Sequence, residues 1–304
     1  MRVVLLAGGG GGARFARGLV DALAEGELTV VGNVGDDVEI LGLHVSPDLD
    51  SLLYALSGLI DDARGWGRAD ETWSAIASVA YWGGDDWFRL GDRDLGLHLV
   101  RTQALREGAP LSAVTADLAG RAGIEARILP ATDGRLRTHL LTPAGRFPFQ
   151  EWFVRRHHED EVDAVDYEGA GEAEPAPGVL DALSGADATL LAPSNPYLSI
   201  GPILALPAIR ETIERRRKRC VAVSPVVGGK AVTGPLDRML SRMAGGTTPR
   251  HVADRYAGLI DALVVDEADV PAEVSVDLVV TRTLMRDREA ARRLAETALE
   301  AACA

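Results

Sequence analysis

Short apolar runs with the length of β-strands alternate with helix-length segments along most of this chain. The runs are residues 2–7, 28–31, 126–129, 188–192, 219–224, 262–265 and 277–280. Strands that alternate with helices form βαβ units, and their parallel strands are buried on both faces. The sequence therefore predicts an α/β fold with a doubly wound, mostly parallel, Rossmann-like sheet.

One stretch breaks this alternation. From residue 132 to 177 the pattern changes to short alternating segments at residues 138–142, 147–154 and 162–167, followed by an acidic run rich in glycine, alanine and proline. A period of two is typical of strands with one exposed face. We therefore expect a Rossmann-like nucleotide-binding core from residues 1–131 and 178–304, and an inserted, partly antiparallel cap subdomain from residues 132–177.

Charge and cysteine content exclude several classes of protein. A net charge of -13 over 304 residues argues against nucleic-acid binding, which needs clustered Lys and Arg. The opening apolar run is too short for a signal peptide, and no window approaches the roughly 18 apolar residues of a membrane span. Cys220 and Cys303 provide neither a disulfide framework nor a metal-ligand spacing. We expect a cytoplasmic protein that binds no membrane.

The first predicted strand ends in five consecutive glycines, and a helix is expected to begin near Phe15. Glycine lets backbone amides approach a phosphate at a helix N-terminus. The run lacks GK[ST] and matches GxGxxG only loosely, so neither a Walker loop nor a dinucleotide fingerprint is assigned. A tight strand-to-helix turn is the alternative. The candidate phosphate-binding residues are Gly9, Gly10, Gly11, Gly12 and Arg14.

The stretch from Val30 to Asp50 contains the candidate catalytic groups. A strand ends at Gly32 and Asn33, and four aspartates follow, namely Asp36, Asp37, Asp48 and Asp50. Ligands bind at the carboxyl edge of an open α/β sheet. Carboxylates this close repel one another unless a cation lies between them. For Asp50 the alternative is a structural N-cap of a predicted helix at residues 51–59.

Three later loops carry further candidates. Trp87 and Arg89 lie in a glycine-bounded loop where an aromatic ring and a guanidinium can bind a planar ligand; the alternative is an aromatic plug with Arg89 paired to an aspartate. Ser194, Asn195 and Ser199 follow one predicted strand and Lys230 follows the next, where they can bind phosphate. The residues alone predict a phosphorylated nucleotide with an acid-bound divalent cation.

Long segments in a fixed order match a known family. They include GGGGGARF at 8–15, GNVGDD at 32–37, SPDLDSLLYALSG at 46–58, DWFRLGDRDLGLHLVRT at 86–102, APSNPYLSIGPILALP at 192–207 and SPVVGGKAVTGP at 224–235. In these segments the chain resembles the 2-phospho-L-lactate transferases of deazaflavin coenzyme (F-420) biosynthesis, especially the actinobacterial members. Gly10 and Ser46 depart from the residues common in relatives, which are Thr or Val and Cys.

The resemblance implies a Mg²⁺-dependent transferase. A phosphoenolpyruvyl or 2-phospho-L-lactyl group would move from a guanosine-diphosphate-linked donor to the ribityl hydroxyl of 7,8-didemethyl-8-hydroxy-5-deazariboflavin (FO), and GMP would leave. A homodimer is expected from the family. The implied residues are Asp50 and Asp37 for catalysis; Asp36, Asp37 and Asp50 for Mg²⁺; Asp50, Arg89 and Trp87 for FO; and Gly9, Gly10, Gly11, Gly12, Arg14, Asn33, Ser194, Asn195, Ser199 and Lys230 for the nucleotide.

Two functions of other classes stay open. A nicotinamide-dependent dehydrogenase would need an acid at the end of the second strand, where Asn33 stands instead. A non-catalytic sugar-nucleotide-binding regulatory protein of the same superfamily would not need the DWFRLGDRD segment at 86–94, because it has no deazaflavin to bind. Binding of FO therefore separates this alternative from the transferase.

Overall fold

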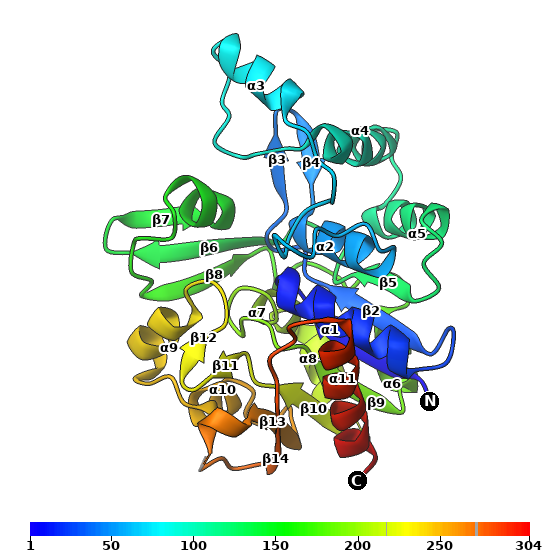
Figure 1. Cartoon of the computed structure of the whole chain (residues 1–304), viewed down its shortest axis with the longest axis vertical. Coiled ribbons are helices and arrows are strands. Elements are labelled where there is room, and N and C mark those ends of the chain that lie inside the picture. The colour runs from blue at the N-terminus through cyan, green and yellow to red at the C-terminus, as the bar shows by residue number, and fades with distance from the viewer. Residues whose placement is uncertain (217, 271–272) are drawn as a thin grey trace.

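The computed structural model describes residues 1–216, 218–270 and 273–304, and its core is a seven-stranded sheet (Figure 1). The strand order is β14-β13-β10-β9-β1-β2-β5, and every neighbouring pair is parallel. The strands are β1 (Val3–Ala7), β2 (Leu28–Gly32), β5 (Arg127–Pro130), β9 (Ala188–Leu191), β10 (Cys220–Val223), β13 (Ala262–Asp266) and β14 (Asp277–Thr281). The predicted doubly wound parallel sheet is confirmed.

The central strands are apolar along their whole length. Every residue of β1, β9, β10 and β13 is buried, as expected for parallel strands covered on both faces. Val3 lies opposite Leu28 of β2 on one side and opposite Ala188 of β9 on the other. This register brings the carboxyl ends of β1, β2 and β9 to the same edge of the sheet.

The order of strand addition reverses at β1. The chain adds β2 and β5 on one side of β1, and later β9, β10, β13 and β14 on the other. Ligands of open α/β sheets bind outside the carboxyl ends of the strands at such a reversal. The loops that follow β1, β2 and β9 therefore frame the expected site.

Helices pack around this sheet, and α1 lies against both α2 and α11. A methyl group at Gly18 of α1 would overlap the backbone of Ala291 in α11, which explains this glycine. No described helix is both long and apolar enough to cross a membrane. The helices are α1 (Gly9–Ala22), α2 (Pro47–Leu56), α3 (Ser74–Tyr81), α4 (Asp92–Arg106), α5 (Leu111–Arg121), α6 (Val179–Gly185), α7 (Gly201–Leu204), α8 (Pro207–Glu214), α9 (Leu236–Ala244), α10 (Pro249–Arg255), α11 (Arg288–Cys303) and the 3-10 helix η2 (Glu267–Asp269).

Three small antiparallel sheets surround the core. The largest has the order β7-β6-β8 and is formed by β6 (Arg137–Thr142), β7 (Gly145–Pro148) and β8 (Ala164–Glu168). The others are the hairpins β3 (Val38–Ile40) with β4 (Leu43–Val45) and β11 (Val226–Val227) with β12 (Lys230–Ala231). The antiparallel character expected within residues 132–177 is observed, and the division of the chain into core and cap subdomain stays a prediction.

Part of the segment expected as a strand at residues 147–154 is helical. A π-helix, η1 (Glu151–Arg155), follows β7 directly. Its Trp152 is buried, and the indole nitrogen donates a hydrogen bond to the carbonyl oxygen of Asp160 at 3.1 Å. Phe149, Trp152 and Phe153 pack together at a spacing of three and four residues, which is helical and not alternating.

Candidate active site

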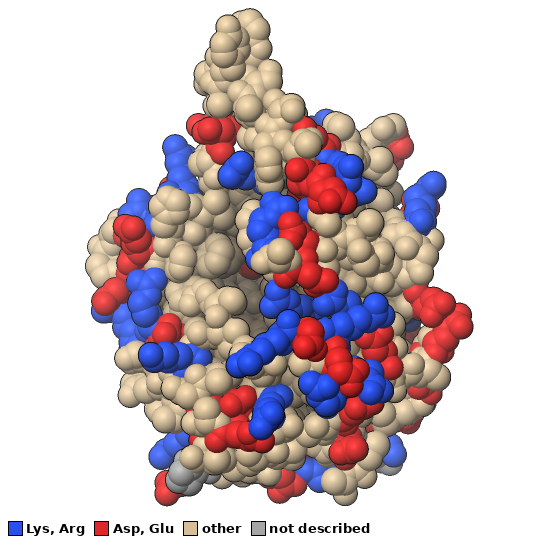
Figure 2. All heavy atoms as spheres, viewed as in Figure 1, with Lys and Arg blue, Asp and Glu red and all other residues tan. Residues whose placement is uncertain are grey.

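The candidate site lies where β1, β2 and β9 end. Figure 2 shows a hollow in this face, between the antiparallel sheet and the region of α1 and α2. The Ser194 hydroxyl after β9 donates to the carbonyl oxygen of Gly8 after β1 at 2.7 Å. The Asn33 amide after β2 donates to the carbonyl oxygen of Leu198 at 3.3 Å. The sequence predicts that four strand ends, those at Gly8, Gly32, Pro193 and Pro225, converge on one crevice, and these bonds join the first three.

The glycine run is the first part of α1, so the expected helix start near Phe15 was wrong. Close packing against other parts of the chain explains why glycine, a poor helix former, occupies these helix positions. A Cβ atom would lie 2.9 Å from the Gly65 carbonyl oxygen at Gly10, and 2.8 Å from the Pro193 carbonyl oxygen at Gly11. The helix N-terminus itself faces the aspartates, because the Gly9 amide donates to Asp48 Oδ1 at 2.8 Å.

Asn33, at the end of β2, is linked to the segment after β1 because Asn33 and Gly9 both donate hydrogen bonds to Asp48. Its Nδ2 also donates to Asp48 Oδ2 at 2.9 Å, and its Oδ1 accepts from the Gly35 amide at 2.8 Å. Burial raises the pKa of Asp48 to about 6, while the hydrogen bonds from Asn33 and Gly9 oppose that rise. Asn33 therefore positions Asp48, and its predicted direct contact with a nucleotide remains untested.

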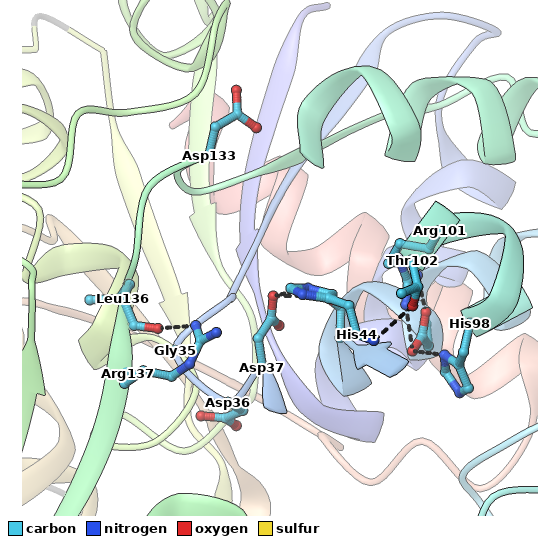
Figure 3. A network of polar contacts seen from close by, with 12 residues as sticks. Gly35, Asp36, Asp37, His44, His98, Arg101, Thr102, Asp133, Leu136 and Arg137 are labelled. Atoms are coloured by element: carbon cyan, nitrogen blue, oxygen red, sulfur yellow. Dashed lines mark hydrogen bonds and ion pairs between the residues drawn. The ribbon is translucent and has the colours of Figure 1, made fainter. Parts of the chain in front are cut away.

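Asp36 and Asp37 each present one unsatisfied carboxylate oxygen. Asp37 Oδ2 accepts from the Ser46 hydroxyl at 2.7 Å and lies 3.0 Å from His44 Nε2, as Figure 3 shows for the histidine. The Oδ1 atoms of both aspartates are buried, and no group among the described residues forms a hydrogen bond with them. Burial, with Asp48 nearby, raises the pKa of Asp36 well above its usual value. Burial and the neighbouring carboxylates therefore disfavour the charged form of Asp36 unless a cation lies beside it.

Asp50 is not the N-cap of its helix. The helix α2 begins at Pro47 with Ser46 as its N-cap, so Asp50 lies in the first turn and is buried. Its Oδ2 accepts from Arg101 Nη1 at 3.2 Å, and its Oδ1 accepts from Arg101 Nη2. Arg101, from α4, is fully buried. A purely structural role for Asp50 would therefore be an ion pair with Arg101 that joins α2 to α4, and not an N-cap.

The same face of α4 carries His98, which is buried, and Asp94, which is half-buried. His98 Nδ1 lies 3.8 Å from Asp50 and Nε2 lies 3.9 Å from Asp94, but burial lowers the pKa of His98 to about 4. It is therefore neutral near pH 7, and neither contact is an ion pair. Tyr54 of α2 donates a hydrogen bond to Asp94. Sequence reasoning missed His98 and Arg101, although their spacing from Asp94 places all three on one helical face.

Two of the three predicted FO residues, Trp87 and Arg89, lie on the segment before α4, whereas Asp50 lies in α2. Arg89 is exposed, and its guanidinium carbon is 4.5 Å from the ring centroid of Trp73. Within the described residues no carboxylate pairs with Arg89, so the predicted alternative of an Asp partner is not observed. Trp87 is half-buried, contacts Phe88 edge to face with centroids 5.7 Å apart, and has the Arg155 guanidinium 5.9 Å from its ring.

The remaining nucleotide candidates divide into two groups. Ser194 and Ser199 are buried against the start of α1, where Ser199 lies over Gly8 and Gly9. Asn195 Oδ1 accepts from the amides of Tyr197 and Leu198, so it shapes its own loop. Arg14 is half-buried beside Gly65. Lys230, on the β11-β12 hairpin, lines a pocket of about 570 Å³ with Trp152 and Met239, and the Met239 sulfur lies 3.7 Å from Asn195 Nδ2.

The aspartate cluster has features of a cation site without a complete ligand shell. In residues 1–216, 218–270 and 273–304, no three His, Cys, Asp or Glu side chains form a ready metal-binding group. The unsatisfied Oδ1 atoms of Asp36 and Asp37 and the raised pKa of Asp36 nevertheless fit a hard cation, which prefers carboxylate oxygens and often keeps several waters. The chemistry of these carboxylates therefore fits a hard cation such as Mg²⁺.

Comparisons with known proteins cover the whole chain. Residues 3–300 match the family described as 2-phospho-L-lactate transferase CofD. The chain is similar to phosphoenolpyruvate transferases of Kitasatospora aureofaciens (45% identity over 311 residues, 98% of this chain and 97% of the relative) and of Thermobifida fusca (44% over 317 residues, 99% and 98%). A solved structure of a UPF0052 family member from Bacillus halodurans shares the fold, with a TM-score of 0.66, 16% identity and coverage of 98% and 99%.

Proposed function

Because this chain belongs to the 2-phospho-L-lactate transferase CofD family, we propose that it transfers a phosphoenolpyruvyl or 2-phospho-L-lactyl group from a guanosine-diphosphate-linked donor to FO. The ribityl hydroxyl of FO attacks the phosphorus that bears the three-carbon acid. A new phosphorus–oxygen bond forms, the bond to GMP breaks, and GMP leaves with the electron pair. The full-length match to relatives named phosphoenolpyruvate transferase carries this proposal and favours the phosphoenolpyruvyl group.

We assign different roles in this reaction to the aspartates at the sheet edge. Asp50, which accepts hydrogen bonds from Arg101, is proposed to accept a hydrogen bond from the attacking hydroxyl or to take its proton. Asp36 and Asp37, with Asp50, are the carboxylates proposed to hold Mg²⁺. A bound Mg²⁺ supplies charge neutralisation for the phosphate oxygens of donor and leaving GMP. The Gly9 to Gly12 segment, through amides other than that of Gly9, and Ser199 are proposed to bind the nucleotide.

FO binding is the experiment that tests this proposal first. Purified protein incubated with FO should carry its visible absorbance through gel filtration. Failure of FO to bind would favour the non-catalytic nucleotide-binding alternative. The dehydrogenase alternative gains no support from β2, since Asn33 at its end is buried and bonded to Asp48. We also propose a cytoplasmic homodimer; the two cysteines are free, and light scattering in solution tests the dimer.

Arg89→Ala should weaken FO binding roughly ten- to hundredfold, because a hydrogen bond to a charged group contributes about 1.5–3 kcal/mol. GDP binding should stay near normal. Fluorescence titration of FO and calorimetric titration of GDP measure the two affinities. Arg93→Ala is the matched control, because Arg93 is exposed and its ion pair with Asp70 is a long surface contact, with 3.9 Å between Arg93 Nη1 and Asp70 Oδ2. Equal losses for both ligands, or a large fall in melting temperature, would assign Arg89 a structural role instead.

Mg²⁺ should raise the melting temperature of the protein, because a ligand that binds only the folded state stabilises it. EDTA should remove that rise and stop turnover. Asp36→Asn should lose most of the rise, whereas Asp117→Asn, which changes an exposed carboxylate paired with Arg121, should keep it. Differential scanning fluorimetry with and without Mg²⁺ measures the effect. An undiminished rise in Asp36→Asn would remove Asp36 from the proposed ligands.

A further inference from the structure

A second cavity, of about 240 Å³, shares a wall with the aspartate cluster. Asp37 and His44 form that wall. Opposite it lie the end of α4, the start of α5 and the loop that enters β6. The volume is ample for several waters or for a small organic acid. Nothing in the proposed roles of Asp36, Asp37, Asp50 or Arg89 accounts for this cavity, which we call the Arg137 pocket after the arginine that lines it.

One side of the Arg137 pocket is apolar. Val34, Leu105, Ala109, Pro110 and Leu111 contribute side chains to it. Val34 and Leu111 are buried whereas Pro110 is exposed, so this wall runs from the packed core to the surface of the protein. An apolar wall of this kind suits a methyl or methylene carbon better than it suits a phosphate or a sugar, whose polar atoms would lose hydrogen bonds to water there.

Most charged groups around the pocket already have partners. Asp133 accepts from the Ser112 amide at 2.6 Å and from the Ser112 hydroxyl at 2.7 Å. Arg135 is 3.2 Å from Glu168. Asp37 accepts from Ser46 and lies beside His44, which leaves its Oδ1 as the unsatisfied atom of the metal candidate. These groups shape the pocket without offering a free cation.

Arg137 differs from them. It is half-buried, and the one hydrogen bond that the described residues give its guanidinium runs from Nη1 to the carbonyl oxygen of the preceding Leu136, at 2.7 Å. Burial lowers the pKa of Arg137, and the nearby charge of Asp37 only partly opposes this. Arginine stays protonated in proteins, so Arg137 keeps its positive charge and has further guanidinium N–H donors besides the one bonded to Leu136. Figure 3 shows the side chain reaching from β6 to the 35–37 turn.

We propose that the Arg137 pocket receives the three-carbon acid of the transferred group, and that Arg137 binds its carboxylate. The fork of guanidinium donors matches a carboxylate in a bidentate way. The apolar wall then faces the methylene carbon of an enolpyruvyl group or the methyl carbon of a lactyl group. The phosphorus attached to the same acid lies on the Asp37 side, next to the proposed cation site. This inference rests on the proposed function and adds the residue that selects the donor.

The test compares ligands that contain the acid with ligands that lack it. The donor and the transfer product contain it, whereas GDP and FO do not. In Arg137→Met the donor and the product should bind roughly ten- to hundredfold more weakly, because a charged hydrogen-bonded pair is lost. GDP and FO should bind within about twofold of wild type, which is well below 1 kcal/mol. Arg137→Lys, which keeps the charge but not the fork, should recover part of the loss.

Controls separate the possible outcomes. Arg146→Met removes an exposed arginine of the same antiparallel sheet, paired with Asp166 and Glu168, and should leave all four affinities unchanged. A matching loss for GDP would place Arg137 on the diphosphate, and an unchanged product affinity would leave it without a ligand; either result overturns the inference. If Arg137→Met is poorly folded, Arg137→Gln replaces it. Wild-type protein that binds neither FO nor product contradicts the proposed function itself.

Discussion

Asp50→Asn is expected to abolish transfer to FO. The substitution keeps the shape of the side chain but removes the charge that pairs with the buried Arg101. Asparagine cannot take a proton from the ribityl hydroxyl, and it is a poor ligand for a hard cation. Steady-state measurement of GMP release gives the loss. Residual turnover above about a tenth of wild type corresponds to less than roughly 1.4 kcal/mol of transition-state stabilisation and would end the catalytic assignment.

A control is needed because Asp50→Asn also leaves the buried Arg101 without a counter-charge. The double variant Asp50→Asn/Arg101→Gln removes both charges and should be more stable than Asp50→Asn alone, yet equally inactive. Circular dichroism and a denaturant titration report its folding. Activity that returns with stability would show that the single variant failed for lack of folding and not for lack of the carboxylate.

Arg101→Met should lower the free energy of unfolding by roughly 3–5 kcal/mol, because breaking a buried ion pair strands the remaining charge. Asp50 and Arg101 are both buried, and the Arg101 guanidinium donates two hydrogen bonds to the Asp50 carboxylate. Urea denaturation measures the change. Arg106→Met is the matched control on the same helix, because Arg106 is exposed and its one side-chain hydrogen bond in the described part of the chain is to the Gly42 carbonyl oxygen. It should cost less than about 1 kcal/mol.

The coupling between the two residues gives a stricter test. Adding Asp50→Asn to Arg101→Met should destabilise the protein less than the sum of the two single changes, because the partners act as one unit. Additive losses would show that Arg101 stabilises the fold through packing of its side chain alone. In that case α4 would not position Asp50, and the role of Arg101 in the site would need another explanation.

The sheet was predictable from sequence because buried parallel strands leave continuous apolar runs. Each run from residue 2 to residue 280 became a strand of the central sheet. The predicted starts of α1 and α2 were less accurate than the predicted strands. Pro47 after Ser46 is a known signal of a helix start, and it shows that Asp50 lies inside α2. The glycine run was misread because contacts with Gly65 and Pro193, far away in sequence, select for the absence of side chains.

The four aspartates and the three converging strand ends could be predicted because they adjoin the strands in sequence. Arg101 and His98 could not be assigned, since their partner Asp50 is about fifty residues away and only the packing of α4 on α2 brings them together. Arg137 escaped notice for the same reason. It begins β6, and it reaches the 35–37 turn because the Thr138 amide donates to the Gly35 carbonyl oxygen at 2.7 Å.

The central claim is that the sheet edge around Asp36, Asp37 and Asp50 transfers an acid-bearing phosphoryl group to FO. The most direct measurement mixes the protein with FO, Mg²⁺ and the guanosine-diphosphate-linked donor, and quantifies GMP and the modified FO by chromatography with mass detection. The account predicts equal amounts of GMP and of FO carrying one phosphoenolpyruvyl or phospholactyl group. GMP without modified FO, or FO that stays unchanged at full donor and metal saturation, would contradict it.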